Sequence, residues 1–154
     1  MITELSEKAG IIENIKLSRI YDQFKELLDL LKQRELPLNI IEIINHDIEE
    51  LNISPLIDTS LRKLFKQKQN RILKLLEKEL KIVTKDHYKN LWLAIGPSVF
   101  GFPIGLALSS NFFDNMAFFI IGMPMGILIG MIIGSNMDKK AYNEGRQLDI
   151  IIKY

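Results

Sequence analysis

The sequence has no cysteine, only two histidines, and a single charged side chain between residues 90 and 137. Without cysteine there is no disulfide and no thiolate chemistry, which fits a reducing compartment. His46 stands beside Asp47, which we interpret as a surface pair, and neither His46 nor His87 has the carboxylate–histidine spacing of a metal site. No phosphate-cradling glycine loop occurs outside residues 90–137. We therefore expect no enzyme, no metal and no cofactor.

The scarcity of charge is concentrated in two apolar runs, Asn90–Phe113 and Asn115–Met137, which are separated by Asp114. Each run is long enough to cross the hydrocarbon core of a bilayer, which is about 30 Å thick and takes about 20 helical residues. We predict a transmembrane hairpin with spans at about residues 91–110 and 116–136.

The hairpin divides the chain into three parts: a cytoplasmic helical domain over residues 1–89, the hairpin over 90–137, and a cytoplasmic tail over 138–154. Lysine and arginine flank both spans but are absent from the connecting SSNFFDN, so the positive-inside rule predicts that both termini face the cytoplasm. The opening MITELSEK has no basic region followed by an apolar region, and we expect no cleavable signal peptide.

Small residues recur every four positions in both spans. They are Pro97, Gly101, Gly105 and Ser109 in the first span and Gly122, Gly126, Gly130 and Gly134 in the second. This interval lets two helix backbones approach closely, because in lipid the attraction must come from packing. One antiparallel register pairs Gly105 with Gly122, Gly101 with Gly126, Pro97 with Gly130, and Leu93 with Gly134. We interpret the rows as joining the two spans of one subunit; the alternative is that one row faces a symmetry mate or a pore.

Prolines and polar residues add two further features to the hairpin. Pro97, Pro103 and Pro124 remove backbone donors inside the spans, which favours a packed bundle over a lone hairpin in lipid. Polar residues gather at the ends of the spans, where in an oligomer each would form a ring. The candidates for a gate or pore end are Ser135, Asn136 and Asp138 at the cytoplasmic end and Asp114 at the other. Alternatively, these are ordinary helix ends with interfacial charges.

The soluble half has helical periodicity throughout. We predict helices over about Ser6–Arg34, from Pro37 to about Leu51, and from Pro55 towards Lys89, the last continuing into the first span with little interruption. The fold class is therefore all-α: an N-terminal helical bundle or coiled-coil stalk, then a two-helix transmembrane hairpin and a short C-terminal tail. We favour a stalk or coiled-coil bundle over a compact globule, and we expect the β-prone Ile150–Ile152 to form an edge strand or to fold back on the stalk.

Charge divides sharply along this half. Residues 1–54 carry eleven acidic and six basic side chains, whereas residues 55–89 carry four acidic and ten basic ones. A basic helix binds phosphates of nucleic acid or of anionic lipid without reading sequence. The ligand-binding candidates are Arg62, Lys63, Lys66, Arg71 and Lys74. The alternative partner for this helix is the acidic first segment of the same or a neighbouring subunit.

The glycine rows and the EGRQLD tail, together with the helical domain before them, resemble small bacterial two-span glycine-zipper membrane proteins. Within that group the layout is similar to the channel-forming effectors of Hailong anti-phage defence systems. The resemblance implies a tetrameric, anion-conducting channel in the bacterial inner membrane. It also implies that a single-stranded DNA oligomer or nucleotide signal holds the channel shut, that a partner nucleotidyltransferase is encoded nearby, and that phage infection opens the channel and depolarises the cell.

Two functions from different classes follow from the sequence. The first is an oligomeric ion channel gated by a nucleotide signal that binds the helical domain. The second is a membrane-anchored adaptor whose hairpin is only an anchor and whose helical stalk recruits a protein partner. The prolines, the polar span ends and the basic helix favour the channel.

Overall fold

The computed structural model describes residues 1–7, 11, 14–112 and 119–153, and it confirms a mostly helical chain. The chain divides into two compact units. The first comprises Met1–Ile82 together with Leu148–Tyr154, and the second comprises Val83–Gln147.

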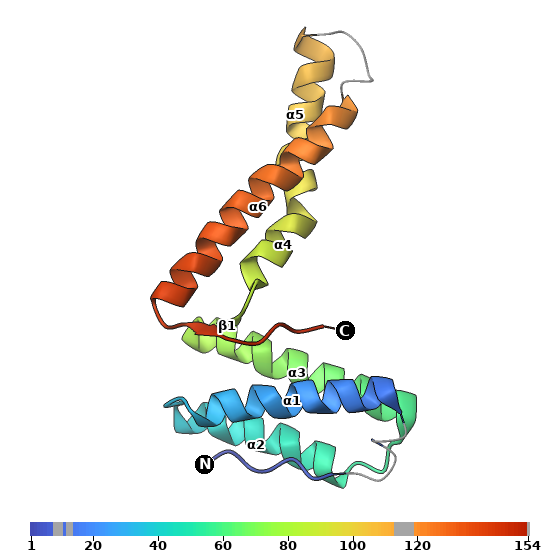
Figure 1. Cartoon of the computed structure of the whole chain (residues 1–154), viewed down its shortest axis with the longest axis vertical. Helices are drawn as coiled ribbons and strands as arrows, with labels where there is room; N and C mark the ends of the chain where they lie inside the picture. The colour runs from blue at the N-terminus through green and yellow to red at the C-terminus, as the bar shows by residue number, and fades with distance from the viewer. Residues whose placement is uncertain (8–10, 12–13, 113–118, 154) are drawn as a thin grey trace. The chain divides into compact units, whose positions relative to one another are not determined.

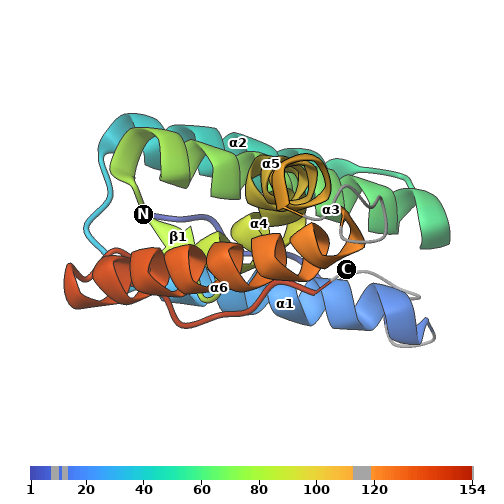
Figure 2. The same cartoon turned by 90° about the horizontal axis from the view of Figure 1, so that it is seen from above.

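The first unit is built on the helices α1 (Ile15–Lys32), α2 (Leu38–Ile53) and α3 (Asp58–Leu80). Each helix has an apolar stripe, and α3 packs against both of the others (Figures 1 and 2). At the centre of the core the Phe65 ring meets the rings of Phe24 and Tyr21 edge to face, at centroid distances of 5.7 and 5.9 Å. The first unit is therefore a helical bundle, which was one of the two arrangements expected, and not an extended stalk. The predicted start of the first helix near Ser6 is wrong: residues 1–7 are not helical, and α1 begins at Ile15 because the Asn14 side chain caps it.

The expected continuation of α3 into the first span is wrong. The helix ends at Leu80 because Lys81 adopts the left-handed conformation, with φ of 56°. The two-residue strand β1 (Val83–Thr84) follows, and then Asp86 adopts the left-handed conformation with φ of 58°. Such residues are usually glycine or asparagine, so the sequence held no signal for this break.

The second unit is an antiparallel pair of helical arms (Figure 1). The first arm consists of α4 (His87–Gly96), the π-helical segment η1 (Pro97–Gly101), α5 (Phe102–Ala107) and a second π-helical segment, η2 (Leu108–Phe112). The second arm is α6 (Phe119–Asn143). Two stretches, His87–Ser110 and Ile120–Asn143, are long and apolar enough to cross a membrane, which confirms the two predicted spans as helices of the required kind.

The chain leaves α6 through a turn at Gly145, whose φ is 68°. The strand β2 (Gln147–Leu148) then pairs with β1 in a two-stranded sheet. Beyond it, Leu148 and Ile150 are buried in the core of the first unit, and the backbone N–H of Lys153 donates to Gln23 Oε1 at 2.8 Å. The tail therefore docks on the helical bundle, but its strand lies before the β-prone Ile150–Ile152 and not within it.

Candidate functional site

The two arms of the second unit meet through glycines. A Cβ built on Gly122 would lie 2.6 Å from the Cα atom of Gly105, and one on Gly126 would lie 2.7 Å from the Cα atom of Gly101. Side chains do not approach a backbone this closely, so any larger residue would push the arms apart. The structure thus brings together, within one chain, two of the pairs in the predicted register.

Beyond these two pairs the register differs from the prediction. A Cβ on Gly130 would lie 3.2 Å from the Cα atom of Gly96, and one on Gly134 would lie 2.6 Å from the Cα atom of Lys89. The expected partners of Gly130 and Gly134 were Pro97 and Leu93. The cause is η1, in which hydrogen bonds reach back five residues and the wider turn takes up an extra residue. A constant four-residue spacing does not reveal such a turn, and sequence reasoning therefore missed Gly96.

Large apolar side chains point away from the contact between the arms. Within an apolar 18-residue window of each stretch, only 17% of the first and 22% of the second is buried, whereas a core helix of a soluble protein is mostly buried. The exposed side chains include Val99, Phe102, Ile120, Ile127, Leu128 and Ile132. Small residues inside and large apolar residues outside are the arrangement expected of a helix pair surrounded by lipid.

Asp138 links the two arms by hydrogen bonds. It lies on α6, is 7% exposed, and accepts the backbone N–H groups of Tyr88 at 3.0 Å and Lys89 at 2.9 Å. These groups belong to the first turn of α4, where N–H groups have no helical partner and the helix dipole attracts a carboxylate. Asp86, which precedes α4, makes no side-chain cap hydrogen bond there. Asp138 therefore caps α4 from the opposite arm, a role that sequence reasoning missed because only the folded hairpin brings the two together.

The other candidate gate residues are placed differently. Ser135 and Asn136 lie on α6 with exposed side chains. Asp114 lies outside the described residues. In the first arm, the hydroxyls of Ser109 and Ser110 both donate to the carbonyl of Leu106, at 3.1 and 2.8 Å, so these hydroxyls are bonded within their own helix.

Three of the five candidate ligand-binding residues share one face of α3. At about 100° per residue, positions 63, 66 and 74 fall within roughly a quarter of the helix circumference. Lys63 and Lys74 are exposed, and Lys66 is half-buried. Arg62 is half-buried and lies at the edge of this face, about 40° from Lys66. Arg71 lies at the other edge, about 60° from Lys74, and is bonded to Asp47 on α2 at 2.9 Å. The face of Lys63, Lys66 and Lys74 is called the basic face below.

A buried ion pair joins α2 to α3. Asp47 is fully buried, and its Oδ1 accepts from Lys68 Nζ at 2.8 Å; Lys68 also pairs with Glu50. Burial alone would lower the pKa of Lys68, but the hydrogen bonds to Asp47 and Glu50 outweigh it and raise the pKa. Because the pKa of Lys68 is higher in the folded chain, the ion pair stabilises the fold fully at a pH below the pKa of an unfolded lysine. This stabilisation is lost as the pH rises through the pKa of Lys68 in the folded chain.

The same carboxylates form the one group of potential metal ligands in the described part of the chain. His46, Asp47 and Glu50 offer ligand atoms within 4.8 Å of one another. The ammonium group of Lys68 already contacts both carboxylates and supplies their cation, so we assign no metal to this group. The interpretation of His46 and Asp47 as a surface pair is wrong for Asp47, which is buried, while His46 Nδ1 lies 3.2 Å from Glu50.

Comparisons with known proteins find no match to a protein-family model, to a curated protein or to a solved structure.

The shifted register predicts a difference between two neighbouring small residues. Gly96→Leu should disrupt the hairpin, because a Cβ there already comes within 2.6 Å of the Gly126 carbonyl oxygen. Ala94→Leu should have little effect, because Ala94 is exposed. Thermal unfolding of both variants in detergent, followed by circular dichroism, tests this. Equal midpoints for the two would contradict the register.

The Asp138 cap predicts a loss of stability that depends on the acceptor. Asp138→Ala leaves two partly buried N–H groups without an acceptor and should destabilise the hairpin by about 1–2 kcal/mol. Asp138→Asn retains one acceptor oxygen and should cost less, and Ser135→Ala should change nothing because its side chain is exposed. Denaturation of the three purified variants gives the ranking, and an Asp138→Ala variant as stable as the Ser135→Ala variant would rule out the cap.

The buried ion pair predicts that Lys68 cannot be lost alone. Lys68→Met leaves Asp47 buried with only Arg71 for charge and should lower the free energy of unfolding by about 3 kcal/mol. Lys63→Met is the matched control on the exposed side of the same helix and should change it by less than about 0.5 kcal/mol. Adding Asp47→Leu to Lys68→Met should recover much of the loss. Urea denaturation that gives the same value for both single variants would contradict this account.

Proposed function

We propose that this chain is an integral membrane protein that assembles into an oligomeric ion channel, gated by a nucleotide or oligonucleotide signal bound to its cytoplasmic helical domain. Membrane insertion is supported by two long apolar helices that meet through glycine and expose large apolar side chains. An aqueous protein rarely leaves an apolar surface of this extent uncovered.

The irregular backbone of the spans is the observation that carries the channel proposal. Pro103 and Pro124 are exposed on the outer surface of the arms, and neither has a backbone N–H to donate. Ser98, in the π-helical η1, is exposed as well. Lipid offers no hydrogen bonds, so irregular backbone at membrane depth is tolerated where other protein or a water-filled cavity covers it. In the proposed oligomer, a second hairpin or a water-filled path covers the surface that carries Ser98, Pro103 and Pro124.

The charge at the cytoplasmic end of the arms supports conduction of anions. Lys85 is exposed just before the first arm, and Lys139 and Lys140 are exposed near the end of the second, where Lys140 also pairs with Glu144 at 4.0 Å. In an oligomer these positive charges repeat around the axis and raise the local concentration of anions. The path itself is apolar, so it closes by dewetting when it is narrow.

The basic face of α3 is the proposed sensor. Lys63, Lys66 and Lys74 present like charge along one side of the helix, which suits the evenly spaced phosphates of an oligonucleotide. By the resemblance to Hailong effectors, the bound oligomer, made by a nucleotidyltransferase encoded nearby, keeps a tetrameric channel closed. Its loss during phage infection opens the channel and depolarises the inner membrane.

The second candidate is a membrane-anchored adaptor, and a specific observation favours it. The glycine rows are used in the contact between the arms of one chain, and both oxygens of Asp138 accept bonds from α4. A hairpin whose glycine contacts and Asp138 hydrogen bonds are all made within one chain serves as a membrane anchor without forming an ion path.

Anion flux from vesicles tests the proposal. The full chain, inserted into liposomes, should release a trapped anion, and short single-stranded DNA should slow the release. Lys63→Glu with Lys74→Glu should remove the effect of DNA without abolishing flux, because the basic face loses its attraction for phosphate. Lys153→Glu, an exposed lysine in the tail, is the matched control. No flux from protein shown to be inserted would leave the adaptor and overturn the channel.

A further inference from the structure

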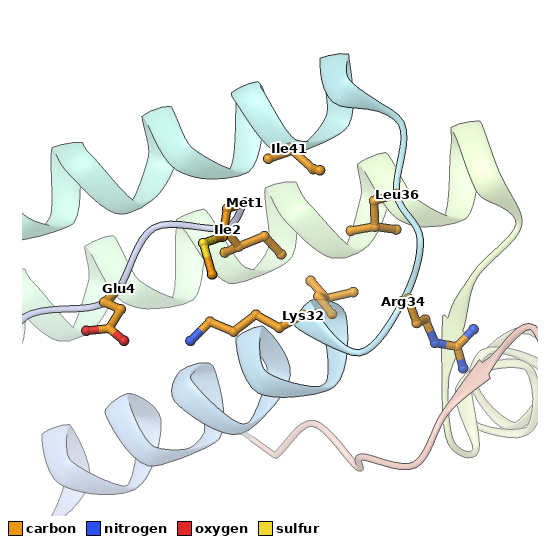
Figure 3. A pocket seen from close by; sticks show the side chains of 8 residues that line it. Met1, Ile2, Glu4, Lys32, Arg34, Leu36 and Ile41 are labelled. Atoms are coloured by element: carbon orange, nitrogen blue, oxygen red, sulfur yellow. The ribbon is translucent and has the colours of Figure 1, made fainter.

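The first seven residues lie as an extended segment between α1 and α2, where Figure 3 shows Met1, Ile2 and Glu4. The segment has no helix or strand of its own. It is held instead by two asparagines of α2, Asn45 and Asn52, whose side chains bond its backbone. We call residues 1–7 the resident segment and the space it occupies the groove.

Both asparagines bond the backbone in the same way. Asn45 Oδ1 accepts the N–H of Thr3 at 2.7 Å, and its Nδ2 donates to the carbonyl of Met1 at 3.0 Å. Asn52 Oδ1 accepts the N–H of Ser6 at 2.9 Å, and its Nδ2 donates to the carbonyl of Glu4 at 3.0 Å. Each amide therefore reads one carbonyl and the N–H two residues later, which any extended peptide offers.

The spacing of the asparagines matches the spacing of an extended chain. Asn45 and Asn52 are two turns apart on α2, which is about 10.5 Å along the helix axis. The two bonded backbone units are three residues apart, and three extended residues cover about 9–10 Å. Two matched pairs of bonds in the right register form a template for a peptide backbone, independent of its sequence.

Side chains add selectivity. Ile2 is 7% exposed in the core, and Leu5, three residues later, is partly buried against it. Between them, the exposed Glu4 lines two cavities together with Lys25 and Lys32 of α1, and Lys32 also pairs with Asp29 at 3.2 Å. The groove thus accepts apolar residues at two positions three apart and favours an acidic residue just before the second.

The resident segment fills the groove incompletely. A cavity of about 480 Å³ remains beside Ile2, with Leu31, Leu36 and Ile41 among its walls (Figure 3). Its size falls within the range of ligand pockets. The side chain of Met1 does not fill it, because Met1 is fully exposed. A ligand with a larger apolar residue at the Ile2 position would bury more surface than the chain's own residues do.

We infer that the groove between α1 and α2 is a binding site for an extended peptide of a partner protein, with the pattern apolar, any residue, acidic, apolar, and that residues 1–7 occupy it as a displaceable substitute. The unfilled cavity favours a foreign peptide with a larger apolar residue at the Ile2 position over the chain's own segment. This inference does not depend on the channel proposal, because it concerns the helical bundle alone.

The resident segment competes with any peptide in solution. Because it is tethered, its effective concentration is in the millimolar range, and a free peptide binds the unmodified chain only weakly. Replacing its two anchors in the full chain, by Ile2→Asp with Leu5→Asp, should release the segment and open the groove. This variant is the released chain in the experiment that follows.

Fluorescence anisotropy with labelled peptides on the full chain in detergent tests the inference. The peptide MITELSE should bind the released chain at least about ten-fold more tightly than the unmodified chain. The same peptide with Ile2→Phe should bind more tightly still, because the larger ring enters the cavity. Adding Asn45→Ala and Asn52→Ala to the released chain should weaken binding by about ten-fold or more, since four hydrogen bonds are lost. Asn39→Ala, at an exposed asparagine of the same helix, should not.

A changed peptide, tested on the same released chain, serves as the control. MITELSE with Asp in place of Ile2 and Leu5 should not bind, and circular dichroism should find the released chain as helical as the unmodified one. Equal binding of both peptides, or no binding to a helical released chain, would overturn the inference. A disulfide between Thr3→Cys of one copy and Asn45→Cys of another, in chains of two different lengths, would also overturn it, because a second copy would then fill the groove.

Discussion

Close approach of two helix backbones is the constraint on which the second unit depends. In a bilayer no hydrophobic force holds two apolar helices together, so van der Waals contact must supply most of the attraction between such arms, to which Asp138 adds two hydrogen bonds. Gly101 and Gly105 of one arm reach Gly122 and Gly126 of the other closely enough that no Cβ fits between them. Because the small residues lie in this contact, the large apolar residues lie on the outer surface of the arms.

Glycine packing fixes the distance between the arms, and the hydrogen bonds of Asp138 fix the start of the first arm against the end of the second. Asp138 caps α4 from α6, so the end of one arm and the start of the other are joined at a single carboxylate. A comparable division of roles appears in the first unit. There an apolar core joins three helices, while the buried pair of Asp47 and Lys68 sets how α2 meets α3. Because apolar side chains in place of such a pair often cost no stability, we infer that the pair acts here mainly to fix one arrangement of the two helices.

Much of the fold could be predicted from residue spacing, because helices and close-packed spans are periodic. The two spans, the three soluble helices and the pairs of Gly101 with Gly126 and Gly105 with Gly122 all follow from intervals of three and four residues. The rest is not periodic. The π turn at η1 shifts the register to Gly96, and left-handed Lys81 and Asp86 stop one helix and delay the next. The roles of Asp138, Asn45 and Asn52 arise from partners 40 or more residues away, which no local pattern contains.

The central claim is that the hairpin crosses the membrane with both of its ends on the cytoplasmic side. Since the chain has no cysteine, single cysteines report on it without background. Ser110→Cys, near the far end of the first arm, should react with a membrane-impermeant maleimide in intact cells. Lys139→Cys, at the end of the second span, should react only after the cells are permeabilised. Labelling of both sites only after permeabilisation would contradict the claim.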